Sequence, residues 1–134
     1  MTENIEKSLL SLLKYCENEK FKGYDPYDTL NSVFPIQKLG NWASFIAIQI
    51  QKRNPINIRA LLGIRKFRST KGMGLFFEAY LNLYEQSKDE AYLPIIEEIK
   101  HWLIDNSTSF NGEVCWGYDY PYVTAKSKVS KDFP

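Results

Sequence analysis

The sequence predicts an all-α protein, and three observations support that fold class. Apolar residues recur every three or four positions along four long segments, which is the spacing of one face of an α-helix. Glycine, proline and asparagine lie between these segments, as expected of helix ends and connecting loops. No stretch shows strands capable of building a sheet.

The first two predicted helices cover residues 3–20 and 37–53. The first has an apolar face opposite its charged residues, and Thr2 is a plausible N-cap. The second has a broader apolar surface, so we expect much of it to be buried. It ends at Asn54-Pro55, because a residue before proline is disfavoured in the α conformation. The apolar positions are Ile5, Leu9, Leu12, Leu13 and Cys16 in the first helix, and Leu39, Trp42, Ala43, Phe45, Ile46, Ile48 and Ile50 in the second.

The third and fourth predicted helices cover residues 72–86 and 89–104. The third is apolar nearly all round, which predicts that it lies between neighbouring elements. In the fourth, Pro94 must lie near the first turn or kink the helix. The link between the two is very short, so we expect them to form an antiparallel hairpin.

Length and composition indicate one globular domain, residues 1–134, with 44% apolar and 25% charged residues. The net charge of +1 argues against nucleic-acid binding as a function. Residues 52–71 nevertheless contain seven basic residues and no acidic one. This basic segment is suited to attract a phosphate or an acidic sugar. Alternatively, it is a solvated loop paired with the acidic helices that follow.

The sequence also indicates where the chain resides and which sites to exclude. The N-terminus lacks the apolar core of a signal peptide, and no stretch is long enough to span a membrane. We therefore expect a cytoplasmic protein in which Cys16 and Cys115 are small core residues rather than a disulfide. The single histidine, His101, and two distant cysteines do not have zinc-site spacing. We expect neither a metal nor a cofactor.

Polar and aromatic residues are concentrated between Gly23 and Ser32, where two interpretations stay open. Asp25, Pro26 and Asp28 form a helix-start signal, with Asp25 as N-cap and Asp28 at the third position. The same carboxylates, with Tyr24 nearby, also suit a binding or acid–base site at a helix mouth. The cap interpretation does not account for the tyrosines.

A second cluster, Cys115 to Tyr120, contains Trp116, Tyr118 and Asp119. Tryptophan and tyrosine present flat apolar faces with a polar edge, which suits stacking on sugar rings or other planar ligands. The alternative is a loop whose aromatic residues fill the open end of a helix bundle. Gly72-Met73-Gly74 is a weaker signal of a phosphate-binding helix start, and close packing at the start of a helix also accounts for it.

Several motifs together resemble a known family. They are Gly23-Tyr24-Asp25-Pro26-Tyr27-Asp28, Leu30-Asn31-Ser32, Arg59-Ala60-Leu61-Leu62-Gly63-Ile64, Lys71-Gly72, Leu75-Phe76, Trp102-Leu103 and Cys115-Trp116-Gly117-Tyr118. Along nearly its whole length the chain resembles the N-terminal part of bacterial polysaccharide-biosynthesis-associated proteins. That family is similar to the (α/α) toroids shared by six-hairpin glycosidases and terpenoid cyclases.

The resemblance implies antiparallel helical hairpins around a central cavity, with a sugar-facing site at one end. It implies Tyr24, Asp25, Asp28, Trp116 and Tyr118 as residues of the cavity mouth. After Tyr118 this chain has Asp119-Tyr120-Pro121-Tyr122 in place of an aromatic-acidic-Trp continuation. A full toroid needs on the order of a dozen helices, so four long ones predict a partial toroid and a truncated member of the family.

The leading hypothesis is therefore a carbohydrate-associated toroid protein involved in polysaccharide biosynthesis or processing. If it is an enzyme, Asp25, Asp28 or Asp119 are the candidate acids for glycoside or polysaccharide processing. The alternatives are a non-catalytic helical scaffold or interaction protein, and an inactive truncated product. For the scaffold we expect the basic segment to meet an acidic partner. For the truncated product we expect self-association, or pairing with the missing hairpins, through exposed helix faces.

Overall fold

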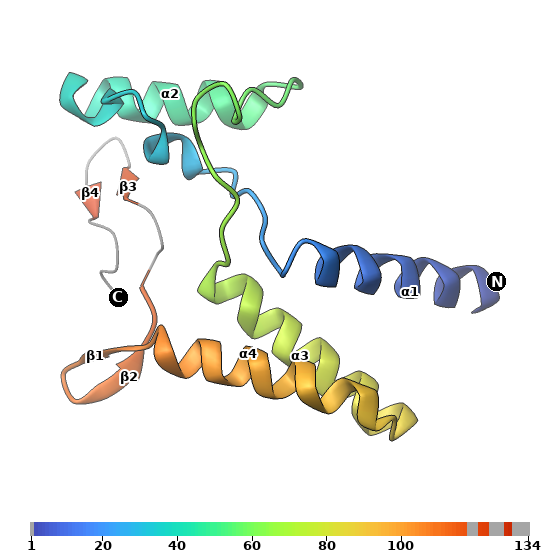
Figure 1. Cartoon of the computed structure of the whole chain (residues 1–134). Helices are drawn as coiled ribbons and strands as arrows, with labels where there is room; N and C mark the ends of the chain where they lie inside the picture. Colours follow the sequence, from blue (N-terminus) through green and yellow to red (C-terminus); the bar gives the residue numbers. More distant parts are fainter. Residues whose placement is uncertain (1, 118–120, 124–127, 130–134) are drawn as a thin grey trace.

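The structure, a computed structural model, describes residues 2–117, 121–123 and 128–129 (Figure 1). This part of the chain is mostly helical, which confirms the predicted helical character. Its elements in order are α1 (Thr2–Asn18), η1 (Asp28–Asn31), η2 (Ile36–Leu39), α2 (Asn41–Arg53), α3 (Thr70–Ser87), η3 (Glu90–Tyr92), α4 (Leu93–Asp105), β1 (Thr108–Phe110), β2 (Glu113–Cys115), β3 (Tyr122–Val123) and β4 (Lys128–Val129), where η is a 3-10 helix.

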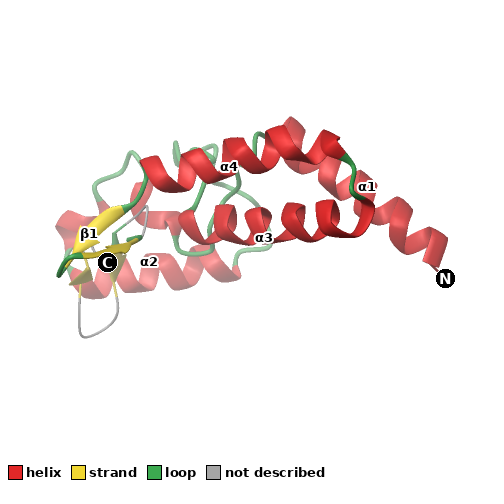
Figure 2. Cartoon of the chain, turned by 90° about the horizontal axis from the view of Figure 1, so that it is seen from below, coloured by secondary structure: helices red, strands yellow, loops and turns green. Residues whose placement is uncertain are grey.

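Helices α3 and α4 pack side by side as the predicted hairpin (Figure 2). The Ser69 side chain caps α3 by accepting from the Gly72 N–H at 3.1 Å, and Lys88 ends the helix in the left-handed conformation. Pro94 lies in the first turn of α4, as its missing N–H requires. The hairpin and the end of α1 enclose the hairpin core, which consists of Phe21, Met73, Tyr80, Ile96 and Ile99.

Helix α1 joins this core only through its last turns, where Leu13 and Cys16 pack against it. Its N-terminal half projects away from the other elements (Figure 1). Apolar residues in this half, such as Ile5 and Leu10, are more than half exposed. The chain then reverses through Lys20 and Phe21, which both adopt positive φ angles of 53° and 59°. This turn directs the Phe21 ring into the core.

The burial of α2 differs from the prediction. The stripe expected to be buried is exposed at Trp42, Ile46 and Ile50, which are 66%, 51% and 64% exposed. The predicted helix is also interrupted at Gly40, where φ is 96°, a conformation that favours glycine. Of the predicted apolar positions Ile48 is buried, and the polar Ser44 and Gln51 are buried with it on the inner face, which η1, η2 and β3 cover. Periodicity identified the helix but not which face its neighbours cover.

This region has a small core of its own, the α2 cluster, formed by Leu30, Ile48 and Val123. Four polar residues are buried in the same region: Asp28, Thr29, Ser44 and Gln51. The α2 region lies apart from the α3–α4 hairpin in Figure 1, and the segments that precede η1 and α3 run between them. These segments pair where Gly23 and Phe67 exchange two backbone hydrogen bonds of 3.0 Å.

The two small antiparallel sheets, β1–β2 and β3–β4, were not predicted. In the first, Thr108 pairs with Cys115 and Phe110 with Glu113. Asn111 and Gly112 form its turn with φ angles of 52° and 84°. A two-residue turn with two positive φ angles is the one that Asn-Gly favours between antiparallel strands. The signal was therefore present in the sequence and was overlooked.

Candidate functional site

The carboxylates of Asp25 and Asp28 both bind backbone N–H groups of one turn. The Asp25 carboxylate accepts from the Tyr27 N–H at 2.8 Å, and the Asp28 carboxylate accepts from the Asp25 N–H at 3.2 Å. This turn precedes η1, which begins at Asp28. The predicted cap differs from the structure, because the N-cap position of η1 is Tyr27, without a side-chain cap bond, and Asp28 is the first residue of η1 rather than the third. The two carboxylates therefore stabilise the turn before the helix.

Asp28 is also the partner of Arg59. The Arg59 Nε–H donates to both Asp28 carboxylate oxygens at 3.0 Å, and a second guanidinium nitrogen donates to the Asp25 carbonyl at 3.1 Å. The Asp28 side chain is 0% exposed. Burial raises the pKa of Asp28, although the hydrogen bond and charge of Arg59 act in the opposite direction. Asp28 therefore connects residues 25–28 to Arg59, and its buried carboxylate is not accessible to a ligand.

Tyr24 and Asp25 both line a cavity of about 290 Å³, which we call the aromatic pocket. It lies between the end of α1 and the start of α3. Its polar groups include Glu19, Lys66 and Ser69. The rings that line it are Tyr15, Phe21, Tyr24, Phe67 and Phe76. So many rings around one small cavity form a wall that favours a flat, partly apolar ligand.

An ion pair and two cation–π contacts hold Lys66 and Tyr24, which both line the aromatic pocket. The Lys66 ammonium donates to the Glu19 carboxylate at 2.7 Å, and this bond raises the pKa of Lys66. The Arg59 and Lys66 cations lie 5.3 and 5.9 Å from the centre of the Tyr24 ring. Such cation–π contacts fix the ring orientation. The pocket is therefore pre-formed around Tyr24.

Gly72 also lines this pocket, and its surroundings account for the predicted Gly72-Met73-Gly74 signal. A Cβ atom at position 72 would lie 2.8 Å from the Ser69 hydroxyl oxygen that caps α3. Close packing at the helix start therefore accounts for this glycine. Burial, followed by the nearby Glu17 charge, raises the pKa of the Cys16 thiol, which also lines the pocket. That shift favours the unreactive thiol over the nucleophilic thiolate.

A second cavity of about 740 Å³, the basic cavity, lies next to the aromatic pocket. The two share Lys22, Lys66 and Phe67 in their walls. The basic cavity is also lined by Arg65, Arg68, Trp102, Asn31 and Asn106, and none of the described residues that line it is acidic. The basic segment thus contributes three of its cations to one cavity wall.

The ion pairs of the basic segment differ from the alternative prediction. Among the residues that the structure describes, Arg68 alone of this segment pairs with a following acidic helix, through Glu98 of α4 at 2.6 Å. Arg59 and Lys66 instead pair with acidic residues that precede them, Asp28 and Glu19. The segment is therefore held between both halves of the molecule rather than being a solvated loop along α4.

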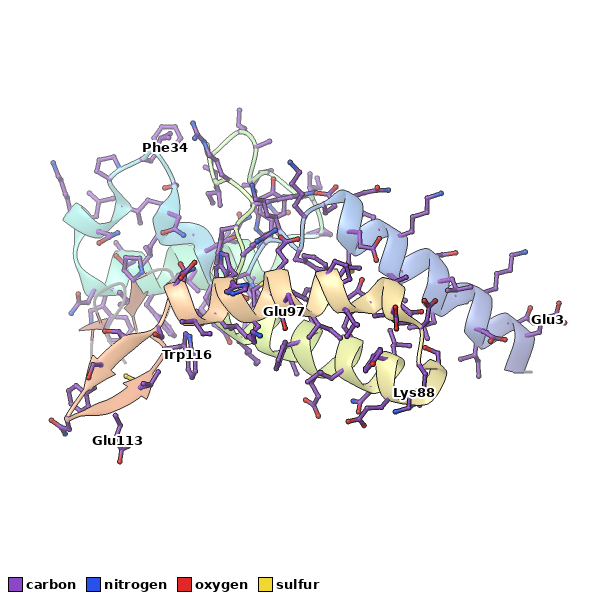
Figure 3. All side chains as sticks on the ribbon, turned by 60° about the horizontal axis from the view of Figure 1, so that its bottom comes forward. Glu3, Phe34, Lys88, Glu97, Glu113 and Trp116 are labelled. Atoms are coloured by element: carbon purple, nitrogen blue, oxygen red, sulfur yellow. The ribbon has the colours of Figure 1, made fainter. Side chains whose placement is uncertain are left out.

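Trp116 does not share a cavity with Tyr24 and Asp25. Its indole N–H donates to the Leu103 carbonyl at 2.8 Å, so it lies at the C-terminal end of α4 beside β2 (Figure 3). It lines neither the aromatic pocket nor the basic cavity. Trp116 is 45% exposed there, so this position distinguishes neither stacking on a ligand nor filling the end of a helix bundle. Tyr118 and Asp119 lie outside the described residues.

Sequence reasoning overlooked Lys22 and Trp102 as site residues. Lys22 lies between the first predicted helix and the cluster that begins at Gly23, and Trp102 lies within the fourth predicted helix. In the structure Trp102 packs on the hairpin core and also lines the basic cavity. The bridge between Gly23 and Phe67, with the bonds of Lys66 to Glu19 and of Arg68 to the Lys20 carbonyl, brings Lys22 to the basic segment, and no local pattern encodes that pairing.

No family model, curated protein or solved structure matches the chain. Within the described ranges, no helix is both long enough and apolar enough to cross a bilayer. The same residues contain no group of three histidine, cysteine or acidic side chains placed to hold a metal ion. The function must therefore be inferred from the two cavities themselves.

Proposed function

We propose that this protein binds carbohydrate, with a sugar ring in the aromatic pocket. The observation that supports the proposal most strongly is that Tyr24 and Asp25 share this pocket with four further aromatic side chains. Sugars present apolar C–H faces and hydroxyl edges, and aromatic rings with nearby polar groups complement both. The volume of 290 Å³ is at the low end of the usual range for ligand pockets and suits a single ring.

The proposed contacts follow from the exposure of the pocket residues. Tyr15 is 58% exposed, so its ring is available to one face of a sugar. The Tyr24 hydroxyl has no hydrogen-bond partner among the described residues and is available to a sugar hydroxyl. The proposal is limited to binding, because Asp28 is withdrawn by its burial and Arg59, and Asp119 lies outside the described residues.

The polysaccharide-related (α/α) toroid remains the architecture that we propose for this function. The α3–α4 hairpin supports it, since a toroid is assembled from such units. In that arrangement the aromatic pocket would lie at the mouth of the central cavity, as the resemblance implies for Tyr24 and Asp25.

The test is calorimetric titration with a panel of neutral and acidic mono- and oligosaccharides. Tyr15→Ala is the informative variant, because the exposed ring can be removed without opening the core. We expect binding about threefold to tenfold weaker than in the parent protein, the effect of one aromatic contact. Trp42→Ala is the matched control, since Trp42 is an exposed aromatic on α2 that lines neither cavity. If no saccharide binds, or Tyr15→Ala leaves every affinity unchanged, the proposal is wrong.

A scaffold or interaction role is the second candidate, and the exposed apolar faces favour it. Ile5 and Leu12 on α1 and Trp42 on α2 are each more than half exposed. Sedimentation of the parent protein over a range of concentrations tests self-association through these faces. A monomer at all concentrations would leave only a different protein as the partner, and an assembly abolished by Leu12→Gln would support this role.

A further inference from the structure

We propose that the basic cavity binds an anionic group of the ligand, so that the saccharide is an acidic one bearing a carboxylate or phosphate. This inference rests on the proposed function and specifies its substrate class. The cavity is lined by four cationic side chains, Lys22, Arg65, Lys66 and Arg68, and by no acidic residue among those described. Like charges gathered around one cavity repel one another, and an anion relieves that repulsion.

The ion pairs of the basic cavity show which of its cations are available to an anionic ligand. Lys66 is paired with Glu19, and Arg68 is paired with Glu98. Lys22 and Arg65 make no ion pair with any residue that the structure describes, and both are exposed. Two positive charges therefore face the cavity without a carboxylate opposite them. An anionic ligand would pair with Lys22 and Arg65 without displacing an existing ion pair.

The other lining groups complement an acidic sugar. The planar Arg65 guanidinium has the donor geometry that carboxylates and phosphates accept in pairs. Asn31 and Asn106 line the same cavity and provide amide groups for hydroxyls. Trp102, which is half-buried against the hairpin core, adds one fixed aromatic surface.

The two cavities share part of their walls, so one ligand could place its sugar ring in the first and its anionic group in the second. Lys22, Lys66 and Phe67 belong to both walls, so a ligand ring in the aromatic pocket would present its next group to the cations of the basic cavity. The basic cavity, at 740 Å³, is more than twice as large as the aromatic pocket, at 290 Å³. That difference favours an oligosaccharide that extends from the pocket into the basic cavity.

The experiment compares two matched pairs of probes by calorimetry. One pair is a galactose tetrasaccharide and the corresponding galacturonate tetrasaccharide, and the other is galactose and galactose 6-phosphate. We expect at least one of the two charged probes to bind about tenfold or more tightly than its neutral counterpart, galactose tetrasaccharide or galactose respectively. The preference should shrink as salt is raised from about 0.05 to about 0.5 M, because charge contacts with an exposed cavity are screened. Preference for galacturonate alone identifies a carboxylate ligand, and preference for galactose 6-phosphate alone identifies a phosphate.

The variant Lys22→Gln/Arg65→Gln should abolish the preference for charged probes. Arg65→Gln alone, at a residue that lines the basic cavity and not the aromatic pocket, should reduce that preference and leave the affinity for neutral sugars unchanged. Both side chains are exposed, so the fold should be retained. Lys7→Gln/Lys14→Gln on α1 removes the same charge outside both cavities and should leave the preference intact. Equal affinity for charged and neutral probes overturns this inference and leaves the proposed function standing. Inorganic phosphate or an RNA oligonucleotide binding as tightly as the charged sugars overturns the assignment to an acidic saccharide.

Discussion

The hairpin core and the α2 cluster are stabilised in different ways. The hairpin core encloses five large apolar or aromatic residues, and its one buried hydroxyl, on Tyr80, donates to Glu17 at 2.8 Å. The α2 cluster has three buried apolar residues, and four polar ones are buried around it. Two of these polar atoms, Thr29 Oγ1 and Gln51 Nε2, have no hydrogen-bond partner within the described part of the chain. Buried polar atoms without partners destabilise a fold.

This difference suggests how the two regions depend on each other. The hairpin is built from segments close in sequence and from apolar burial, which does not require exact partners. The α2 region instead contains a buried long-range ion pair, Arg59–Asp28. The aromatic pocket borders this region at Tyr24 and Asp25, and Arg59 also binds the Asp25 carbonyl, so the shape of the pocket depends on this pair.

Removing one buried isoleucine from each region tests the contrast directly. Ile99 is 0% exposed in the hairpin core and Ile48 is 1% exposed in the α2 cluster. An isoleucine-to-alanine change costs about 2–5 kcal/mol, with the higher cost where the surroundings cannot collapse. We expect Ile99→Ala near the upper end and Ile48→Ala near the lower end, measured by urea unfolding. Equal losses would show that the two regions are packed alike.

The Arg59–Asp28 pair should control the stability of the α2 region. Asp28→Ala or Arg59→Ala each leaves a charge uncompensated in a mostly buried place, which costs about 3 kcal/mol of unfolding free energy. The double variant Asp28→Ala/Arg59→Ala should cost clearly less than the sum, because no lone charge remains. Additive losses in urea unfolding would mean that the two side chains stabilise the fold independently. Lys100→Ala, which breaks a surface pair with Glu97, should change stability by less than about 1 kcal/mol.

Tyr80 should give the hairpin core a stability that depends on alkaline pH. Burial first, and then the hydrogen bond to Glu17, raises the pKa of Tyr80 above its ordinary value of 10.0. The folded state thus holds this proton more tightly than the unfolded state does. Its contribution is complete below pH 10 and is lost as pH rises above 10.

The variant Tyr80→Phe removes this titration. Thermal unfolding should show a loss of about 1 kcal/mol at neutral pH, the net value of one hydrogen bond. It should also show a shallower fall in stability above pH 10 than in the parent protein. Tyr15→Phe, which alters an exposed tyrosine, should keep the parent's alkaline slope. An unchanged slope in Tyr80→Phe would contradict the role of this hydroxyl.

The sequence predicted local structure better than it predicted contacts between distant segments. The hairpin of α3 and α4 follows from apolar spacing and a short link, and Pro94 lies in a first turn as expected. The covered face of α2 was predicted only at Ile48, because η1, η2 and β3 cover the polar Ser44 and Gln51 beside it and leave Trp42, Ile46 and Ile50 exposed. Asp25 and Asp28 were identified as a cap signal, but the pairing of Asp28 with Arg59 spans 31 positions, beyond any local pattern.

The candidate site, too, could be predicted only in its local parts and not in the contacts between distant segments. Its first half, Tyr24 and Asp25, was visible as a cluster in the sequence, and the basic segment was visible as a charge imbalance. Their meeting depends on the bridge between Gly23 and Phe67 and on the turn at Lys20 and Phe21. That turn uses left-handed conformations at residues other than glycine. Such conformations have no sequence signature, since lysine and phenylalanine both disfavour them.

The smallest predicted effect concerns this turn. Lys20 has a φ of 53° and an exposed side chain, and its carbonyl accepts from Arg68 Nε–H at 2.8 Å. Lys20→Gly keeps that carbonyl and removes a backbone strain of about 1–2 kcal/mol, against an entropy cost of about 0.5–1 kcal/mol in the unfolded chain. We expect a net stabilisation of up to about 1 kcal/mol in thermal unfolding. Lys14→Gly, the same change inside α1, should instead destabilise the helix by about 1 kcal/mol. If both variants lose stability equally, the turn is unstrained, and the connection between the two regions stores no conformational energy.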